Sequence, residues 1–271
     1  MTNNILEVDN VTMQFGGLFA LKDVSFAVKP KELFAIVGPN GAGKTTLFNV
    51  ISGFYRPTSG KVSFLDQDIS TAQPHEVARL GAVRTFQNLG VFESLTVLES
   101  VCLAKHRHLL GNNFLASFKN LVQPWRNVEQ EARELIAFVG LEGFEDAESY
   151  NLPYGYQKRL EIARSLATEP KVLMLDEPAA GLNDEEKLDI RQVIRKVVER
   201  DIAVLLVEHD IKLVTDISDR AIVLDYGKLI AEGKPKEVMS DKRVIAAYIG
   251  ERYTKRMEGK VITSDDNVES D

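Results

Sequence analysis

Short apolar runs alternate with charged amphipathic stretches through much of the chain. The nearly continuous apolar runs at residues 33–37, 172–175 and 203–207 predict strands that are buried on both faces. Residues 185–200, between the last two runs, predict a charged amphipathic helix. This alternation of strand and helix predicts a largely parallel central sheet, in which ligands lie beyond the carboxyl ends of the strands.

The first part of the chain predicts strands joined by tight turns. Residues 6–15 and 21–28 flank the turn Gly16-Gly17, and residues 62–64 follow a second turn signal. Near the other end, residues 221–231 contain two short apolar runs around a turn and predict a hairpin.

The middle of the chain has a helical pattern instead. Residues 95–110 and 128–139 carry apolar residues at helical spacing and few strand signals. We therefore predict a mainly helical insertion from residue 88 to about residue 166. The connection between those two helices is rich in glycine, asparagine and aromatic residues, and its pattern allows no definite assignment.

Length and composition narrow the functional class. The 271 residues suit one large domain with a substantial insertion, here residues 1–250, and the polar, acidic residues 251–271 are expected to be disordered. The formal net charge of −7 indicates no general affinity for nucleic acid. The single cysteine, Cys102, excludes an intrachain disulfide. No signal peptide or membrane-spanning run is evident, so any membrane role is expected to depend on a partner.

A glycine-rich string after the first buried strand provides the strongest candidate chemistry. This phosphate loop consists of Gly38, Pro39, Asn40, Gly41, Ala42, Gly43, Lys44, Thr45 and Thr46, and it matches the pattern G-x-x-x-x-G-K-[ST]. Glycines bring backbone N–H groups close to phosphate oxygens, and the helix that begins near Lys44 directs its positive dipole end at the same anion. Lys44 is expected to reach the β- and γ-phosphates, and the hydroxyl of Thr45 can ligate Mg²⁺. Strand, loop and helix together predict a nucleotide site, and the alternative is a glycine-rich turn without a ligand.

Two carboxylates follow the second buried strand. Asp176 ends that strand beside the predicted loop and is suited to holding Mg²⁺ through its water shell. Glu177, one residue later, could polarise a water for in-line attack on the γ-phosphate. The alternative is a pair of solvated acids that cap a turn, which the phosphate loop upstream disfavours.

Two further polar residues are expected at the same edge of the sheet. His209 follows the strand 203–207 and could donate a hydrogen bond to the γ-phosphate, although a lone histidine at a strand end is more often structural. Gln87 lies where the sheet meets the helical insertion, and its amide could reach Mg²⁺ or the attacking water; the alternative is a polar loop residue. The remaining histidines form no convincing metal pattern with His209, so no transition-metal site is predicted.

Five separate elements, in this order, resemble the nucleotide-binding subunit of ABC transporters over roughly residues 5–250. They are the phosphate loop, Gln87, the segment 152–164, Asp176-Glu177-Pro178 and His209. The resemblance implies an α/β fold with a P-loop NTPase (RecA-like) core, an N-terminal antiparallel β subdomain and an inserted α-helical subdomain. It also implies an ATPase that uses ATP and Mg²⁺.

The same resemblance implies a role for each matching residue. Phe15, in Gln14-Phe15-Gly16-Gly17, would stack on adenine, and Gln87 would link the γ-phosphate to a transport subunit. Glu177 would be the general base, and His209 would be the switch histidine. The implied catalytic set is Glu177, His209, Lys44 and Gln87, and the implied metal set is Thr45, Gln87 and Asp176.

The signature segment (residues 152–156) departs from the family pattern. The family's L-S-G-G-Q is replaced here by Leu152-Pro153-Tyr154-Gly155-Tyr156. Pro153 stands where a serine hydroxyl would meet the γ-phosphate, and proline has no N–H to substitute for it. Leu152 and Gly155 are still expected to help complete the ATP site of a second subunit, with fewer hydrogen bonds. Residues 179–184 would form the D-loop at the dimer seam.

Residues 154–164, 176–183 and 208–210 look still more like the LivG-type ATPases of branched-chain amino-acid importers. This resemblance implies the ATP-hydrolysing subunit of an importer, peripheral at the cytoplasmic face of the membrane. Its partners would be a second ABC ATPase subunit, in a homo- or heterodimer, transmembrane permease subunits and, indirectly, a solute-binding protein.

Two alternatives stay open. One is an ABC-type ATPase outside transport, which the acidic balance disfavours if it acts on nucleic acid. The other is an ATP-dependent dimerisation switch with weak hydrolysis, against which Glu177 and His209 argue.

Overall fold

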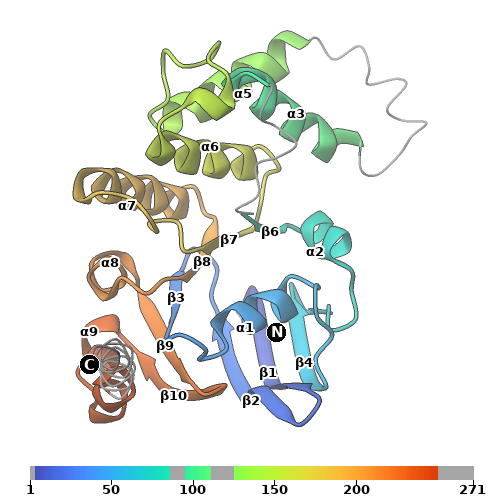
Figure 1. Cartoon of the computed structure of the whole chain (residues 1–271). Coiled ribbons are helices and arrows are strands. Elements are labelled where there is room, and N and C mark those ends of the chain that lie inside the picture. Colours follow the sequence, from blue (N-terminus) through green and yellow to red (C-terminus); the bar gives the residue numbers. More distant parts are fainter. Residues whose placement is uncertain (1–3, 86–94, 111–124, 250–271) are drawn as a thin grey trace, which may run out of the picture.

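The computed structural model describes residues 4–85, 95–110 and 125–249, and these residues form two β-sheets and a group of helices (Figure 1). The larger sheet has six strands in the order β10-β9-β3-β8-β7-β6. Its strands are β3 (Leu33–Val37), β6 (Ala82–Arg84), β7 (Val172–Asp176), β8 (Ala203–Val207), β9 (Arg220–Asp225) and β10 (Lys228–Gly233). All neighbouring strands run parallel except β9 and β10, so the predicted parallel sheet and the predicted hairpin are both confirmed.

Strand β3 is buried on both faces because each face of the central sheet is covered. Phe34 and Ile36 pack into a core shared with the antiparallel sheet, whereas Ala35 and Val37 face a second core with Val214 and Val238. Alternate residues of one strand thus serve two different cores. This arrangement explains why the strand reads as a continuous apolar run in the sequence.

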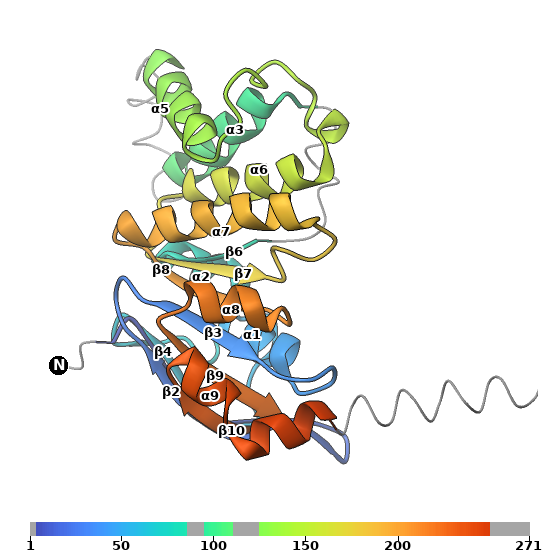
Figure 2. The same cartoon turned by 90° about the vertical axis from the view of Figure 1, so that its left-hand side faces the viewer.

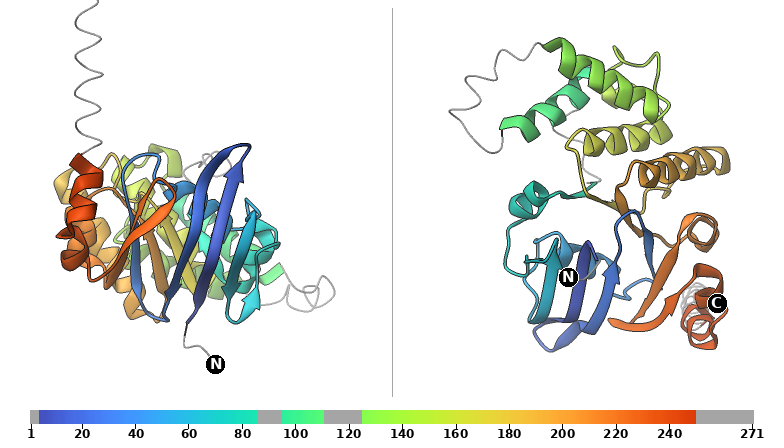
Figure 3. Two further views of the ribbon diagram at one scale, coloured as in Figure 1. Left: turned by 90° about the horizontal axis from the view of Figure 1, so that it is seen from below. Right: turned by 180° about the vertical axis from the view of Figure 1, so that it is seen from behind.

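The smaller sheet is antiparallel, with the strand order β2-β1-β4-β5. It contains β1 (Leu6–Phe15), β2 (Leu18–Val28), β4 (Ser59–Phe64) and β5 (Gln67–Asp68). The three strands predicted in this region are confirmed, but β2 and β4 begin earlier than predicted, at Leu18 and Ser59. The rings of Phe26 and Phe34 stack with centroids 5.2 Å apart and join the two sheets. In Figures 1 and 3 this sheet lies on one side of β3 and β9, and α8 and α9 lie on the other.

Helices cover the central sheet and form a separate group at one end. The covering helices are α1 (Lys44–Ile51), α2 (Pro74–Leu80), α7 (Asp184–Glu199), α8 (Ile211–Ile217) and α9 (Pro235–Met239). The predicted helix at 185–200 is confirmed as α7, which begins at a capping box formed by Asn183 and Glu186. The sequence pattern missed α2, α8 and α9, because helices of five to seven residues are too short for a clear periodicity.

The two helices predicted at 95–110 and 128–139 are also present, as α3 (Val97–Leu110) and α5 (Trp125–Phe138). The short 3-10 helix η1 (Ser149–Asn151) and the helix α6 (Tyr154–Leu166) follow them within the insertion. Figure 2 shows α3 and α5 beyond α6, and α6 alongside α7. Leu160 of α6 and Ile194 of α7 share a core with Leu173 of the sheet, so the helical group packs directly against the sheet's helix layer.

The predicted domain boundaries stay a prediction. The proposed start of the insertion at residue 88 and the proposed tail at 251–271 lie outside the described residues, as does the connection 111–124. Within the described ranges, no helix combines the length and the apolar character needed to cross a membrane.

Candidate functional site

The phosphate loop begins directly after β3 and ends within the first turn of α1. Gly43 is the N-cap of α1 and has a φ of 104°, in the left-handed region. A Cβ added to Gly43 would lie 2.6 Å from the carbonyl oxygen of Ala20, and one added to Gly38 would lie 2.2 Å from that of Leu224. Glycine is therefore required at both positions by close approach of backbone from β2 and β9.

The ammonium group of Lys44 lies inside the loop. Its Nζ donates hydrogen bonds to the carbonyl oxygens of Gly38 and Pro39, at 2.7 and 2.9 Å, and the side chain is buried. Asn40, Gly41 and Thr45 are exposed, Thr46 is partly buried, and Ala42 is buried. The loop thus presents open backbone and the Thr45 side chain outward while its lysine is folded inward.

Two of the predicted catalytic residues meet beyond the carboxyl ends of β7 and β8. The N–H of Glu177 donates to the carbonyl of Val207 at 2.9 Å, which extends the pairing of β7 with β8 by one residue. Glu177 itself has a φ of 48°, so the chain turns sharply at this residue. Its Oε1 lies 3.7 Å from Nδ1 of His209, and both side chains retain exposed surface. The tertiary structure therefore brings a carboxylate and an imidazole together at one edge of the sheet.

Asp176, the predicted magnesium ligand, is held by a residue that sequence reasoning missed. Oδ2 of Asp176 accepts a hydrogen bond from Arg84 at 2.7 Å, and Arg84 also donates to Oδ1 of Asn49 at 2.7 Å. Both side chains of the Arg84–Asp176 ion pair are mostly buried. Arg84 thus joins α1, immediately after the phosphate loop, to the acidic end of β7. No signal in the sequence distinguishes this arginine from an ordinary residue of a short strand.

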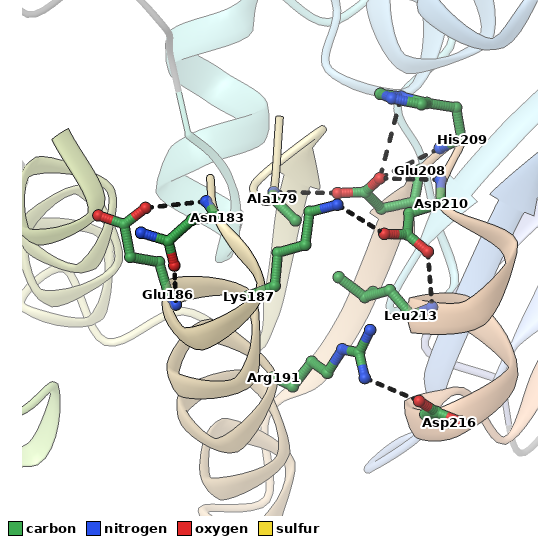
Figure 4. A network of polar contacts seen from close by, with 10 residues as sticks. All are labelled: Ala179, Asn183, Glu186, Lys187, Arg191, Glu208, His209, Asp210, Leu213 and Asp216. Carbon is green, nitrogen blue, oxygen red and sulfur yellow. Dashed lines mark hydrogen bonds and ion pairs between the residues drawn. The ribbon is translucent and has the colours of Figure 1, made fainter. Parts of the chain in front are cut away.

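A second missed residue, Glu208, lies beside His209 at the edge of the sheet where Glu177 and His209 meet (Figure 4). It is fully buried, and its carboxylate accepts from the backbone N–H groups of Ala179, His209 and Asp210, at 3.0, 3.1 and 3.4 Å. Burial raises the pKa of the Glu208 carboxyl, while these N–H groups act in the opposite direction. An acidic residue directly after a fully apolar strand is the one sequence signal that could have identified it.

Asp210 continues this network toward the next helices. It caps α8 by accepting from the N–H of Leu213 at 3.0 Å, and it forms an ion pair with Lys187 of α7 at 3.0 Å. Burial raises the pKa of Asp210, but the hydrogen bonds from Leu213 and Lys187 outweigh it, and the net pKa lies below its usual value. A second pair, Arg191 with Asp216 at 2.7 Å, runs parallel to the first, as Figure 4 shows.

The signature segment leads into α6 and packs against the residues that precede and begin α7. Leu152 is buried in the core of the helical group, and its carbonyl oxygen accepts from Nε2 of Gln157 at 2.9 Å. The half-exposed Tyr154 lies against Gly181, since a Cβ on that glycine would be 3.2 Å from the tyrosine ring. Gly155 lies against the carboxylate of Glu186, 2.7 Å from an added Cβ. The predicted contacts of Leu152 and Gly155 with a nucleotide stay predictions.

Phe15 and Gln87 complete the set of predicted residues. Phe15 ends β1 and is 45% exposed, and its ring meets that of Tyr55 edge to face with centroids 5.4 Å apart. Gln87 lies outside the described residues, so its place relative to the site stays a prediction.

Comparison with protein families and curated proteins gives matches along most of the chain. A family model described as ABC transporter matches residues 21–180, and one described as branched-chain amino acid ATP-binding cassette transporter matches residues 228–254. The chain is 46% identical over 257 residues to the high-affinity branched-chain amino acid transport ATP-binding protein BraF of Pseudomonas aeruginosa, covering 93% of this chain and 100% of that one. It is 40% identical over 256 residues to the corresponding protein LivG of Escherichia coli K12, again covering 93% and 100%.

Comparison with solved structures also gives matches to ATP-binding cassettes. An ATP-binding cassette of an ABC transporter in its ADP conformation matches with a TM-score of 0.81 and 34% identity, over 92% of this chain and 100% of that chain. A dimeric ATP-binding cassette in a post-hydrolysis state, bound to ADP and Pi, matches with a TM-score of 0.72 and 27% identity, over 85% and 98%. The similarity therefore extends over nearly the whole fold and is not confined to the phosphate loop.

Proposed function

Because the chain belongs to the ABC transporter family, as an ATP-binding subunit that hydrolyses ATP, we propose that it powers the import of branched-chain or related amino acids. The solute is inferred from the names of its relatives and from the family match at residues 228–254. The observation that carries the catalytic part is geometric: the phosphate loop and the Glu177–His209 pair follow strands of the same parallel sheet, at their carboxyl ends.

Binding of the triphosphate is proposed to occur at the phosphate loop and the N-terminus of α1. The β- and γ-phosphates would accept from the loop's backbone N–H groups, which the positive end of the helix dipole assists. Lys44 now donates to the neutral carbonyls of Gly38 and Pro39. Phosphate oxygens carry charge and make stronger hydrogen bonds to an ammonium group, so Lys44 would exchange these partners when ATP binds. The exposed ring of Phe15 is proposed to stack on the adenine.

Hydrolysis is proposed to use Glu177 as the general base. Its carboxylate would take a proton from a water as the water oxygen attacks the γ-phosphorus, and the bond to the β–γ bridging oxygen would break to release ADP. His209, whose Nδ1 lies 3.7 Å from Glu177, would donate a hydrogen bond to the γ-phosphate and orient it toward the water. Lys44 and the loop amides would stabilise the charge that develops on the transferring group.

The residues present fit a magnesium ion. Thr45 offers an exposed hydroxyl in the first turn of α1, and Asp176 offers a carboxylate at the end of β7. Oxygen ligands of this kind, with water and phosphate completing the shell, suit Mg²⁺. When bound, Mg²⁺ would neutralise charge on the β- and γ-phosphates. Arg84 would hold Asp176 in place, and Gln87 is proposed as a further ligand.

The working unit is proposed to be a pair of ATPase subunits on the cytoplasmic face of a membrane. A similar cassette of 27% identity has been solved as a dimer, which supports this arrangement. Leu152 and Gly155 would then complete the ATP site of the second subunit, with the D-loop residues 179–184 at the seam. Transmembrane permease subunits, and indirectly a solute-binding protein, would be the other partners. If the second subunit has a complete L-S-G-G-Q, one of the two ATP sites would be the stronger.

Phosphate release by the purified full-length chain tests the catalytic assignment. Glu177→Gln is expected to lower kcat by about 100-fold or more, because it removes the proton acceptor, while ATP binding persists. Glu185→Gln, which neutralises an exposed acid at the start of α7, is the matched control and is expected to behave as wild type. Equal rates for wild type and Glu177→Gln would refute the assignment.

Co-purification from membranes with permease subunits, and uptake of labelled leucine by the assembled system, test the transport part.

A further inference from the structure

We propose that Glu208 is a positioning residue that fixes the general base and the switch histidine relative to each other. This inference rests on the roles proposed above for Glu177 and His209. Glu208 touches neither the nucleotide nor the reacting water in that scheme. It acts through hydrogen bonds to the backbone of the two turns that carry the catalytic side chains, and its Oε2 also lies 4.0 Å from Nδ1 of the His209 ring, as Figure 4 shows.

The first connection runs from Glu208 to the turn after β7. Oε1 of Glu208 accepts from the N–H of Ala179 at 3.0 Å. Ala179 lies two residues after Glu177, and the same turn is closed by a hydrogen bond from the N–H of Ala180 to the carbonyl of Glu177, at 3.1 Å. Glu177 adopts a left-handed conformation there, with a φ of 48°. Such a conformation persists only where surrounding contacts fix it, and the Glu208–Ala179 hydrogen bond is one of these contacts.

The second connection runs from the other oxygen of the same carboxylate. Oε2 of Glu208 accepts from the N–H groups of His209 and Asp210, at 3.1 and 3.4 Å. Asp210 is tied in turn to Lys187 of α7, so the His209 turn is held from both sides. One rigid planar group therefore links the backbone two residues after the base to the backbone at the histidine.

The burial of Glu208 indicates that its carboxylate serves to position the two turns and not to stabilise the fold. Glu208 has no solvent exposure, and a buried carboxylate is costly unless hydrogen bonds compensate for the lost water. A well-packed apolar residue commonly stabilises a fold at least as well as a buried charge does. An apolar residue could not accept from three backbone N–H groups in two different turns. The 3.7 Å separation of Glu177 and His209 thus depends on an acceptor that reaches both turns at once.

Glu208→Gln is the variant that separates positioning from folding. The amide has nearly the same shape, but only one of its two ends can accept a hydrogen bond. If its oxygen serves His209 and Asp210, its NH₂ group faces the N–H of Ala179, and the connection to the Glu177 turn is lost. Glu32→Gln is the matched control, because Glu32 is also a buried carboxylate that accepts from a backbone N–H, that of Lys29 at 2.7 Å, far from the catalytic edge in sequence.

The experiment measures kcat, KM for ATP, the dissociation constant of a fluorescent ATP analogue and the melting temperature of the full-length chain. Glu208→Gln is expected to lower kcat by about 10- to 100-fold while nucleotide affinity changes by less than about twofold. Glu32→Gln is expected to leave kcat unchanged. In a His209→Ala background, Glu208→Gln is expected to lower kcat by a clearly smaller factor, because one of the two side chains it positions is already absent.

Three results would overturn the inference. The first is an unchanged kcat in Glu208→Gln. The second is a fall in nucleotide affinity and melting temperature in Glu208→Gln that parallels the fall in kcat. The third is that Glu208→Gln lowers kcat by the same factor whether or not the His209 side chain is present. A wild-type protein that releases no phosphate would instead refute the proposed function, so the two failures can be told apart.

Discussion

The phosphate loop and the signature segment are both glycine-containing turns that lead into a helix, yet they are built differently. Gly43 has a left-handed φ of 104°, and backbone from β2 lies 2.6 Å from the position of an added Cβ. Gly155 lies within the first turn of α6, and the group nearest to it is the end of the Glu186 side chain. The first turn is enclosed by main chain, whereas the second is enclosed by side chains of the same subunit.

This difference shows which half of the proposed ATP site is complete within one chain. Main-chain contacts from two strands restrict the phosphate loop at Gly38 and Gly43, and its lysine is already inside. The signature segment has proline and tyrosine at its second and third positions. Glu186 fills the space around Gly155, and Tyr154 fills the space around Gly181. Flexible side chains can move, so this half of the site can adjust when a second subunit arrives.

The largest expected effect comes from removing the charge of the phosphate loop. Lys44→Ala should weaken ATP binding by about 100-fold or more, because each charge-assisted hydrogen bond is worth about 1.5–3 kcal/mol and Lys44 would make two. Titration with a fluorescent ATP analogue measures this. Lys61→Ala, which removes an exposed lysine from the antiparallel sheet, is the control and should bind as wild type. Equal affinity for the two variants would show that the loop binds phosphate through its backbone alone.

A smaller effect is expected from adding a methyl group inside the same loop. Gly43→Ala should lower the free energy of unfolding by about 2–4 kcal/mol, because it combines left-handed strain with a clash against the carbonyl of Ala20. Gly41→Ala is the matched control: its φ is also positive, at 76°, but nothing lies within 4 Å of an added Cβ. Urea denaturation should therefore give a lower free energy of unfolding for Gly43→Ala than for Gly41→Ala. The reverse order would contradict the conclusion that main chain encloses the loop at Gly43.

The smallest effect is expected at the signature glycine. Gly155→Ala should change the free energy of unfolding by less than about 1 kcal/mol. Alanine favours the helix by about that amount, and this gain offsets the hydrogen bond of about 0.5–1.5 kcal/mol from the Asn183 N–H that the Glu186 carboxylate loses when it moves aside. The same urea measurement tests it. A loss as large as that of Gly43→Ala would mean that the start of α6 is as tightly enclosed as the phosphate loop, and the contrast between the two turns would disappear.

Much of the fold could be predicted because its signals are local. The apolar runs at β3, β7 and β8 are continuous, since covered sheet faces require apolar side chains on both sides. The helix of the phosphate loop begins at Lys44, as its motif predicts. The short helices α2, α8 and α9 could not be predicted, because one or two turns carry too little periodicity and are stabilised by capping and by tertiary packing.

The sequence alone determined which chemical groups this protein has: a loop of glycines with Lys44, the two acids Asp176 and Glu177 at the end of β7, and a histidine after β8. It also determined the order in which they follow the strands. Only the tertiary structure decided which groups meet, because Arg84 reaches Asp176 and Glu208 reaches Ala179 across 92 and 29 residues of sequence. Contacts of this kind depend on which strands lie side by side, and no local pattern specifies that neighbourhood.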